Sequence, residues 1–135
     1  MKQSGVGMRR LALTFGLGLL VFAVSAAAET RIERSLRRLA PGERLVQLCD
    51  YTALQRIRKD ERKFRPDRVI ADGEKDPTFN KNTVIANGAA FRSRGKWYAL
   101  TFRCTAMPDN MKVLSFSYKI GKEIPETKWA AYGLW

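Results

Sequence analysis

The sequence predicts a two-layer α+β domain, in which an N-terminal helix packs on a three- to four-stranded antiparallel meander. Apolar residues at steps of three and four predict the helix, because this spacing places them on one face. Three later segments alternate apolar and polar residues, as half-buried strands do. Cys49 falls in the predicted helix and Cys104 in a predicted strand, so one disulfide would join the two layers.

Residues 1–28 have the three parts of a secretory signal peptide. A basic start is followed by an apolar run over residues 11–24 and by small residues that end at Ala28. This run of 14 residues is shorter than the ~20 that a membrane-spanning helix needs, which disfavours an uncleaved anchor. We therefore expect cleavage after Ala28 and a periplasmic or secreted mature protein.

Residues 29–42 are expected to form a basic helical arm. Thr30 and Glu33 fit a capping box, in which each side chain accepts a hydrogen bond from the other residue's backbone N–H. Three apolar residues at helical spacing follow, flanked by arginines, and the helix should end near Pro41. Such a helix can lie on an anionic membrane surface, but its single short stripe favours packing on the domain.

Residues 43–135 are predicted to form a single domain, which opens with a helix from Glu43 to about Asp60. Cys49 lies within the apolar stripe of this helix. Seven basic residues fall between Arg56 and Arg68, the densest basic segment of the chain. A solvated helix end explains such a segment, although it is also a place to look for an anionic partner.

The second half of the chain is predicted to form the sheet. A short strand over residues 68–72 and a loop over 72–82 precede three longer strands. We place these strands over residues 83–92, 96–105 and 111–120. Turns at Arg94-Gly95 and around Pro108 would join them as two hairpins.

The two hairpins predict a register. Ile85 then faces Cys104, Cys104 faces Leu114, and the apolar residues of all three strands share one face. A slip of one residue would exchange the faces, so this agreement favours the meander. Asn87, opposite Phe102, is the one polar misfit.

The other face of the predicted sheet is mostly small and polar, so we expect it to be exposed to solvent. After Lys122 a short C-terminal helix is expected, and its aromatic residues would cover the edge of the sheet or close the core. The residues assigned to this face are Arg92, Trp97, Thr101, Arg103, Ser115, Ser117 and Lys119.

The two cysteines are expected to form a disulfide, because an even pair in an oxidising compartment is typically bonded. Closing a loop of about 55 residues would stabilise the fold by roughly 4 kcal/mol. A reactive thiol pair is the alternative, but the chain has no C-x-x-C spacing.

The predicted mature chain is basic and lacks histidine. From residue 29 onward, 22 Lys and Arg stand against 13 Asp and Glu, a formal charge of +9. We expect an anionic lipid, glycan or acidic protein of the cell envelope as partner, and no nucleic acid for an exported protein. Without an imidazole, Ser-His-acid and Cys-His catalysis and His-based zinc sites are excluded. We predict no cofactor, metal or catalytic residue, and nothing indicates an oligomeric state.

The candidate binding patch surrounds the first hairpin. Arginine forks suit phosphate and carboxylate, and an exposed tryptophan supplies a stacking anchor. The alternative, which we favour, is a packed pair in which Trp97 lies beneath Arg92 across neighbouring strands. The patch comprises Arg92, Arg94, Lys96, Trp97 and Arg103.

Two other functions stay open. A carboxylate-dependent hydrolase acting on envelope glycan needs two acids roughly 5–10 Å apart in a cleft, one of them in an apolar setting. Asp50 is the acid to inspect, although a salt bridge to a nearby arginine is the favoured interpretation. A protein inhibitor would present an exposed loop such as residues 76–82.

Two segments carry a family resemblance. The first is Leu-Val-Gln-Leu-Cys-Asp at residues 45–50, and the second is Gly-Ala-Ala-Phe-Arg-Ser-Arg-Gly-Lys-Trp-Tyr at 88–98. Together with Phe-Arg-Cys at 102–104 they are similar to the domain-of-unknown-function 930 family of exported bacterial proteins. The resemblance covers about residues 39–134. It supports the fold and the exported location, and it implies no activity and no catalytic or ligand residue.

Overall fold

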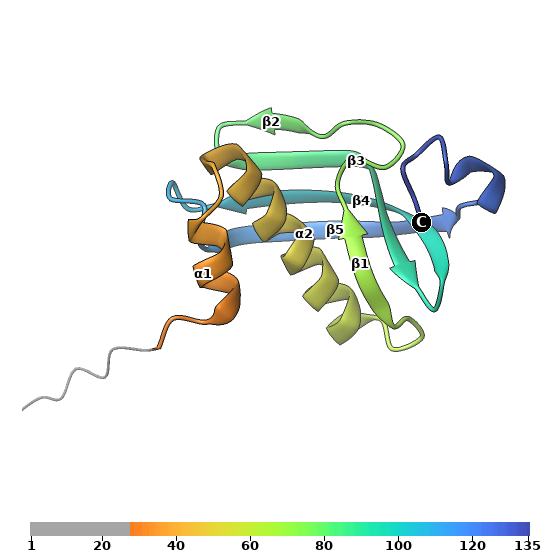
Figure 1. The fold of residues 1–135 in the computed structure, drawn as a ribbon, viewed down its shortest axis with the longest axis horizontal. Helices are drawn as coiled ribbons and strands as arrows, with labels where there is room; N and C mark the ends of the chain where they lie inside the picture. Colours follow the sequence, from red (N-terminus) through yellow and green to blue (C-terminus); the bar gives the residue numbers. More distant parts are fainter. Residues whose placement is uncertain (1–27) are drawn as a thin grey trace, which may run out of the picture.

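The computed structural model describes residues 28–135, which form two helices, a five-stranded sheet and a final 3₁₀ turn (Figure 1). The predicted signal peptide lies outside the described residues, apart from Ala28. No helix between residues 28 and 135 combines the length and apolar character needed to cross a bilayer.

Helix α1 (Arg31–Arg37) has the predicted capping box, since the Thr30 N–H donates to Glu33 Oε2 at 2.8 Å and the Glu33 N–H donates to Thr30 Oγ1 at 3.2 Å. Its Leu36 is buried in the main core, so the arm packs on the domain. Helix α2 (Pro41–Asp60) begins two residues earlier than predicted. Pro41 suits the first turn, where a missing N–H costs no helical hydrogen bond.

The sheet is antiparallel, in the order β1-β3-β4-β5, and β2 pairs with the far half of β3 (Figure 1). The strand predicted over residues 68–72 is found two residues earlier, over Pro66–Ile70. The chain is already in contact with β3 just before this strand, since the Arg65 N–H donates to Ser93 Oγ at 2.8 Å. Strand β2 lies in the segment predicted as a loop, and its three exposed residues gave no alternating pattern. The strands are β1 Pro66–Ile70, β2 Thr78–Asn80, β3 Thr83–Ser93, β4 Lys96–Ala106 and β5 Val113–Glu123.

The predicted register of the first hairpin is correct near its turn and wrong beyond a bulge. Ala89 pairs with Leu100 as expected, but the register shifts between Ala86 and Ala89. Cys104 is therefore opposite Val84, not Ile85. The bulge removes the predicted misfit, because Ala86 takes the place opposite Phe102 and Asn87 turns to solvent.

The predicted register of the second hairpin is wrong by two residues. Cys104 pairs with Phe116, and Leu114 is 63% exposed. The turn is longer than predicted: the Met107 N–H donates to the Lys112 carbonyl at 2.8 Å. Buried Asn110 holds this turn, with a φ of 57° and a bond from its Nδ2 to the Pro41 carbonyl. An even shift keeps the same face buried.

The main core lies between α2 and one face of the sheet. The predicted disulfide is confirmed: Cys49 and Cys104 are bonded, with 5.9 Å between their Cα atoms, and neither cysteine is free. Both are fully buried, together with Ile57 and Phe91. The bond thus joins the helical layer to the middle of the sheet.

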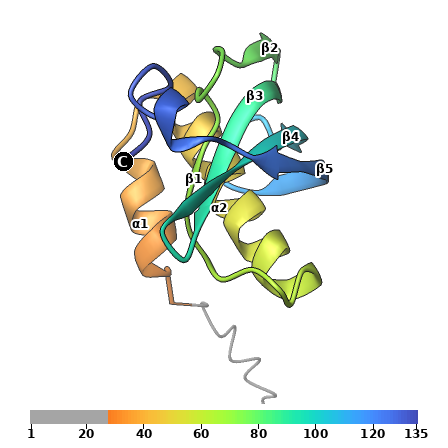
Figure 2. The ribbon, with the colours of Figure 1, turned by 90° about the vertical axis from the view of Figure 1, so that its right-hand side faces the viewer.

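The other face is not fully exposed as predicted, because the C-terminal segment covers one end of it (Figure 2). Trp97, Ile124 and Leu134 are buried in a second, smaller core there. The Ile124 N–H donates to the Trp97 carbonyl at 2.8 Å, which brings the chain back over β4. The expected C-terminal helix is the 3₁₀ turn η1 (Glu126–Lys128).

Candidate functional site

Arg92 of the predicted patch is engaged by the fold. Its Nε and Nη2 donate to the two carboxylate oxygens of Asp67 at 3.0 and 2.8 Å, and its Nη1 donates to the Trp135 carbonyl at 2.7 Å. The guanidinium lowers the pKa of Asp67 below its usual value, chiefly through the hydrogen bond. Arg92 therefore fastens β1 and the C-terminal segment to β3.

Trp97 has the packed arrangement that was the favoured alternative. Its side chain is 1% exposed, and the Arg92 Cζ lies 5.8 Å from the centre of its ring. A buried indole offers no surface for stacking, so the expectation of an exposed anchor is wrong. Arg103 is exposed but pairs with Ser117 far along β4, about 23 Å from Lys96 at ~3.3 Å per residue.

Arg94 and Lys96 remain together at the turn between β3 and β4, and the fold adds two cations to them. Lys63 comes from the segment after α2, and Lys119 comes from β5. Two adjoining hollows of about 480 and 620 Å³ share Lys63 and two aromatic side chains at this end. We call the cations and two shared aromatic side chains of this surface the hairpin-end patch: Lys63, Phe64, Arg94, Lys96, Tyr98 and Lys119. Two acids, Glu61 and Glu123, also line the second hollow.

The cations of the hairpin-end patch are largely unpaired. Within residues 28–135, Lys63, Arg94 and Lys119 form no ion pair, while Lys96 Nζ lies 3.6 Å from Glu123 Oε1. Both side chains of that pair are about half exposed, so water screens it and it contributes little. Four cations against two acids leave the two hollows with a net positive charge, beside the half-buried Phe64 and Tyr98.

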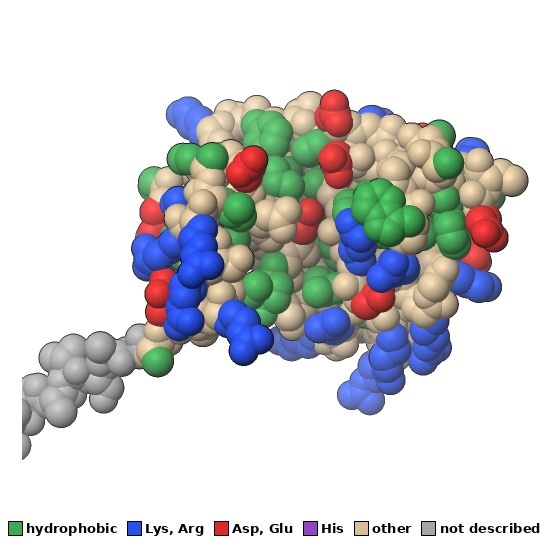
Figure 3. Space-filling view, viewed as in Figure 1, with side chains coloured by type: hydrophobic (Ala, Val, Ile, Leu, Met, Phe, Trp, Pro, Cys, Tyr) green, Lys and Arg blue, Asp and Glu red, His purple; other side chains and the backbone are tan. Residues whose placement is uncertain are grey.

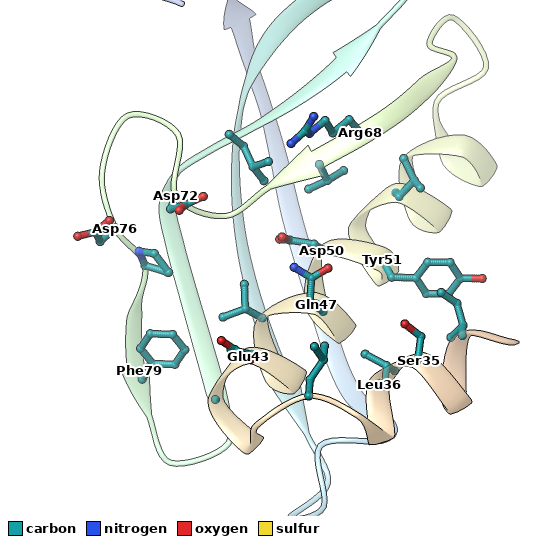
Figure 4. Close-up of a pocket in the computed structure, with 18 of the residues that line it drawn as sticks. Ser35, Leu36, Glu43, Gln47, Asp50, Tyr51, Arg68, Asp72, Asp76 and Phe79 are labelled. Carbon is teal, nitrogen blue, oxygen red and sulfur yellow. The ribbon is translucent and has the colours of Figure 1, made fainter. Parts of the chain in front are cut away.

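A larger groove of about 1200 Å³ lies between the helices on one side and β1 and the segment 72–79 on the other. We call it the helix–loop groove (Figure 4). Leu36, Val46 and Val69 are among its apolar walls, and Phe79, 53% exposed, stands at its rim. In Figure 3 acidic side chains lie around this hollowed face, while Lys and Arg gather over α1 and along the lower edge.

Asp50 projects from the buried side of α2 toward the groove and toward Asp72 (Figure 4). It is 9% exposed, and its Oδ1 has no hydrogen-bond partner among residues 28–135. Burial and the nearby Asp72 carboxylate raise the pKa of Asp50 to about 8, although a bond from the Ala71 backbone opposes the shift. The expected salt bridge to an arginine is absent from the described residues, and Arg68, which lines the same groove, has its Cζ 4.4 Å from the centre of the Trp135 ring.

The segment that carries Asp72 is held against the bulge of β3. Asp72 forms an isolated bridge with Gly88, and the Glu74 N–H donates to the Gly88 carbonyl at 2.7 Å. A Cβ at Gly88 would lie 2.5 Å from the Lys75 backbone nitrogen. The groove wall therefore depends on a position that only glycine fits.

No cluster of residues in the described part of the chain is suited to hold a metal ion. The arrangement suits binding of charged groups: cations of the hairpin-end patch for anions, and carboxylates of the groove for cations. Sequence reasoning singled out Asp50 but missed Glu43 of the same helix and Asp72 and Asp76, because only the folded chain brings the loop that carries the two aspartates to this helix. Excess acid in the segment 72–76 was the available signal.

Comparison with known proteins identifies one family. The model of the Domain of Unknown Function (DUF930) matches residues 36–134, which is most of the chain. No curated protein and no solved structure matches the chain. The matched span runs from the end of α1 to the last buried residue of the second core.

Proposed function

Because the chain belongs to the DUF930 family, whose description names no activity, we propose its function from geometry: a binding module that attaches to an anionic component of the cell envelope. The hairpin-end patch is the binding surface. The observation that carries the proposal is the convergence of Lys63, Arg94 and Lys119, unpaired within residues 28–135, at one end of the sheet.

The chemistry of the patch suits phosphate and carboxylate groups. Arginine presents a fork of donors to an anion, and lysine adds a mobile point charge. Phe64 and Tyr98 line the hollows between these cations and give a partly apolar floor. The net basic charge of the chain would raise the rate of encounter with an anionic surface. Export through the predicted signal peptide would place the protein where such surfaces occur.

Reversing two charges tests the patch. We expect the double variant Arg94→Glu, Lys96→Glu to bind vesicles of phosphatidylglycerol and phosphatidylcholine at least tenfold more weakly, since each basic residue near an anionic surface contributes about 1 kcal/mol. Co-sedimentation with vesicles measures the effect. Competition by a soluble phosphorylated glycan separates a glycan ligand from a lipid one.

The matched control reverses two exposed lysines, Lys81 and Lys112, at the opposite end of the sheet. The change of net charge is the same, so a long-range effect of charge alone would weaken both variants equally. We call Arg94→Glu, Lys96→Glu the hairpin variant. If it bound vesicles as well as the wild type does, or if both double variants lost binding equally, the hairpin-end patch would not be the binding surface.

A carboxylate-dependent hydrolase is the second candidate, and one observation favours it. Asp50 lies in a partly apolar groove with a raised pKa, beside the exposed Asp72, as a general acid beside an ionised partner would. Release of reducing ends from purified envelope glycan, compared between the wild type and Asp50→Asn, tests it. No release by the wild type would eliminate this candidate.

A further inference from the structure

We propose that the helix–loop groove binds a basic, apolar-rich peptide segment of a protein partner, with a lysine or arginine side chain directed at Asp50 and Asp72. This inference concerns a different surface from the hairpin-end patch and does not rest on the function proposed for it. It gives the protein a second site, of opposite charge preference.

The charge of the groove is the reverse of the charge of the chain. Five of the 13 acidic side chains line it, against one of the 22 basic side chains from residue 29 onward. Asp67 is neutralised by Arg92, and the single basic residue, Arg68, lies over the Trp135 ring. Four acidic side chains remain without a cation among the described residues: Glu43, Asp50, Asp72 and Asp76.

Asp50 points to a ligand more directly than the other three. It is more than nine-tenths buried, and its Oδ1 has no hydrogen-bond partner in the part of the chain that the structure describes. A buried polar atom without a hydrogen bond lowers the stability of the folded protein. Such an atom beside a groove therefore indicates a ligand group that would donate the missing hydrogen bond. Figure 4 shows Asp50 directed toward Asp72 of the loop, with Gln47 of its own helix beside it, while Asp76 and Glu43 line more distant parts of the groove.

The apolar walls define the rest of the ligand. Leu36, Val46, Leu54 and Val69 offer apolar surface to the methylene stem of lysine or arginine and to neighbouring apolar side chains. Phe79 at the rim is 53% exposed. The apolar walls disfavour a polyamine, which has no apolar side chains to contact them. The volume of about 1200 Å³ disfavours a single inserted side chain, which would leave most of the groove empty. A peptide of several residues satisfies both features.

A peptide array tests the proposal directly, because it needs no identified partner. The probe is an array of decapeptides that combine lysine or arginine with leucine, valine or phenylalanine in all arrangements, beside copies in which glutamate replaces each basic residue. We expect the full chain from residue 29 to bind basic members and to ignore the acidic copies. Binding to no basic member, or equal binding to acidic ones, would overturn the proposal.

Two variants locate the peptide in the groove. Asp50→Asn and Asp72→Asn should each weaken the best basic peptide about tenfold or more, because the amide oxygen still accepts a hydrogen bond but carries no negative charge to attract the ligand cation. Glu126→Gln, which removes one exposed acid outside the groove, is the matched control and should bind as the wild type does. Undiminished binding by Asp50→Asn and Asp72→Asn would contradict the site.

Calorimetry can measure proton release on binding, which would not change if Asp50 only stabilised the fold. At pH 7 the carboxyl is mostly protonated, and a ligand cation must displace this proton. Binding should therefore release about one proton, measured as a difference in heat between two buffers of unequal ionisation enthalpy. Binding without proton release would remove Asp50 from the site.

The hairpin variant and the glycan assay keep the proposals apart. Arg94→Glu, Lys96→Glu should bind the peptide as the wild type does. Loss of peptide binding in that variant would mean that the peptide binds at the hairpin-end patch and not in the helix–loop groove. Glycan hydrolysis that depends on Asp50 would assign the groove to an enzyme and overturn the peptide site.

Discussion

Asp50 should make the stability of the protein depend on pH. Its pKa is about 8 in the folded state and 3.8 in the reference state, so the folded chain binds more protons than the unfolded chain between these values. The free energy of unfolding therefore falls as pH rises from about 4 to about 8, by at most about 1.4 kcal/mol per pH unit from this group.

Asp50→Asn should remove this decline, because an amide keeps the shape and has no charge to desolvate. We expect the variant to be more stable than the wild type at pH 8 and to differ less at pH 5. Urea unfolding at several pH values measures the difference. Glu126→Gln, which removes an exposed acid outside the groove, is the control, and an identical pH profile in the wild type and Asp50→Asn would contradict the burial argument.

At the same scale, sequence reasoning placed Arg92 beside Trp97 correctly, because cross-strand neighbours follow from the hairpin turn. It did not predict that Ile124 and Leu134 would cover Trp97. Such cover comes from a segment distant in sequence, which strand periodicity does not describe. Asp50 was singled out because it adjoins a buried cysteine, but its acidic neighbours depend on loop geometry.

At the scale of elements, the segment 72–77 should be the most sensitive part of the groove. Gly88→Ala would bring a Cβ to 2.5 Å from the Lys75 nitrogen and 2.9 Å from its carbonyl oxygen. The segment must then leave the bulge, at a cost of about 1–3 kcal/mol in the free energy of unfolding. Hydrogen exchange of the Glu74 amide, which is bonded to Gly88, should accelerate.

Gly42→Ala is the matched control for this prediction. Gly42 lies in the first turn of α2, and a Cβ there meets nothing within 4 Å. The same substitution should therefore stabilise the protein, by up to about 1 kcal/mol, through helix propensity. If Gly88→Ala were equally harmless, the contact between the segment and the bulge would not be holding the groove wall.

Elements were predicted well where their pattern is long and regular, as in α2 and β3 to β5. Their registers were less accurate, because a bulge at Asn87-Gly88 and a buried turn residue, Asn110, depend on tertiary contacts. The even shift in the second hairpin left the buried face unchanged. Strand β2 was missed, since three exposed residues have no apolar alternation.

At the scale of the whole molecule, the fold separates two surfaces of opposite charge. The hairpin-end patch lies at one end of the sheet, and the helix–loop groove lies between the two helices on one side and β1 and the segment 72–79 on the other (Figures 1 and 3). The two proposals together would make the protein an adaptor between an anionic surface and a cationic segment. Both surfaces depend on the helical layer and the sheet keeping their relative position.

The disulfide should provide much of that rigidity. It joins α2 to β4 across 55 residues, and closing such a loop stabilises the folded state by roughly 4 kcal/mol in the chain-entropy model. We expect Cys49→Ala, Cys104→Ala to lower the free energy of unfolding by about 2–5 kcal/mol, measured by urea unfolding. Both sulfurs are fully buried, so the loss also includes a small cavity at the helix–sheet contact.

A second comparison separates the cross-link from the cavity. Wild-type protein that is unfolded, reduced and refolded in reductant keeps both sulfur atoms but not the bond. Because the cavity is then absent, its stability should fall between the values of the oxidised protein and the double alanine variant. If the reduced and oxidised proteins unfolded at the same urea concentration, packing alone would hold α2 on the sheet, and the helix–loop groove would not depend on the bond.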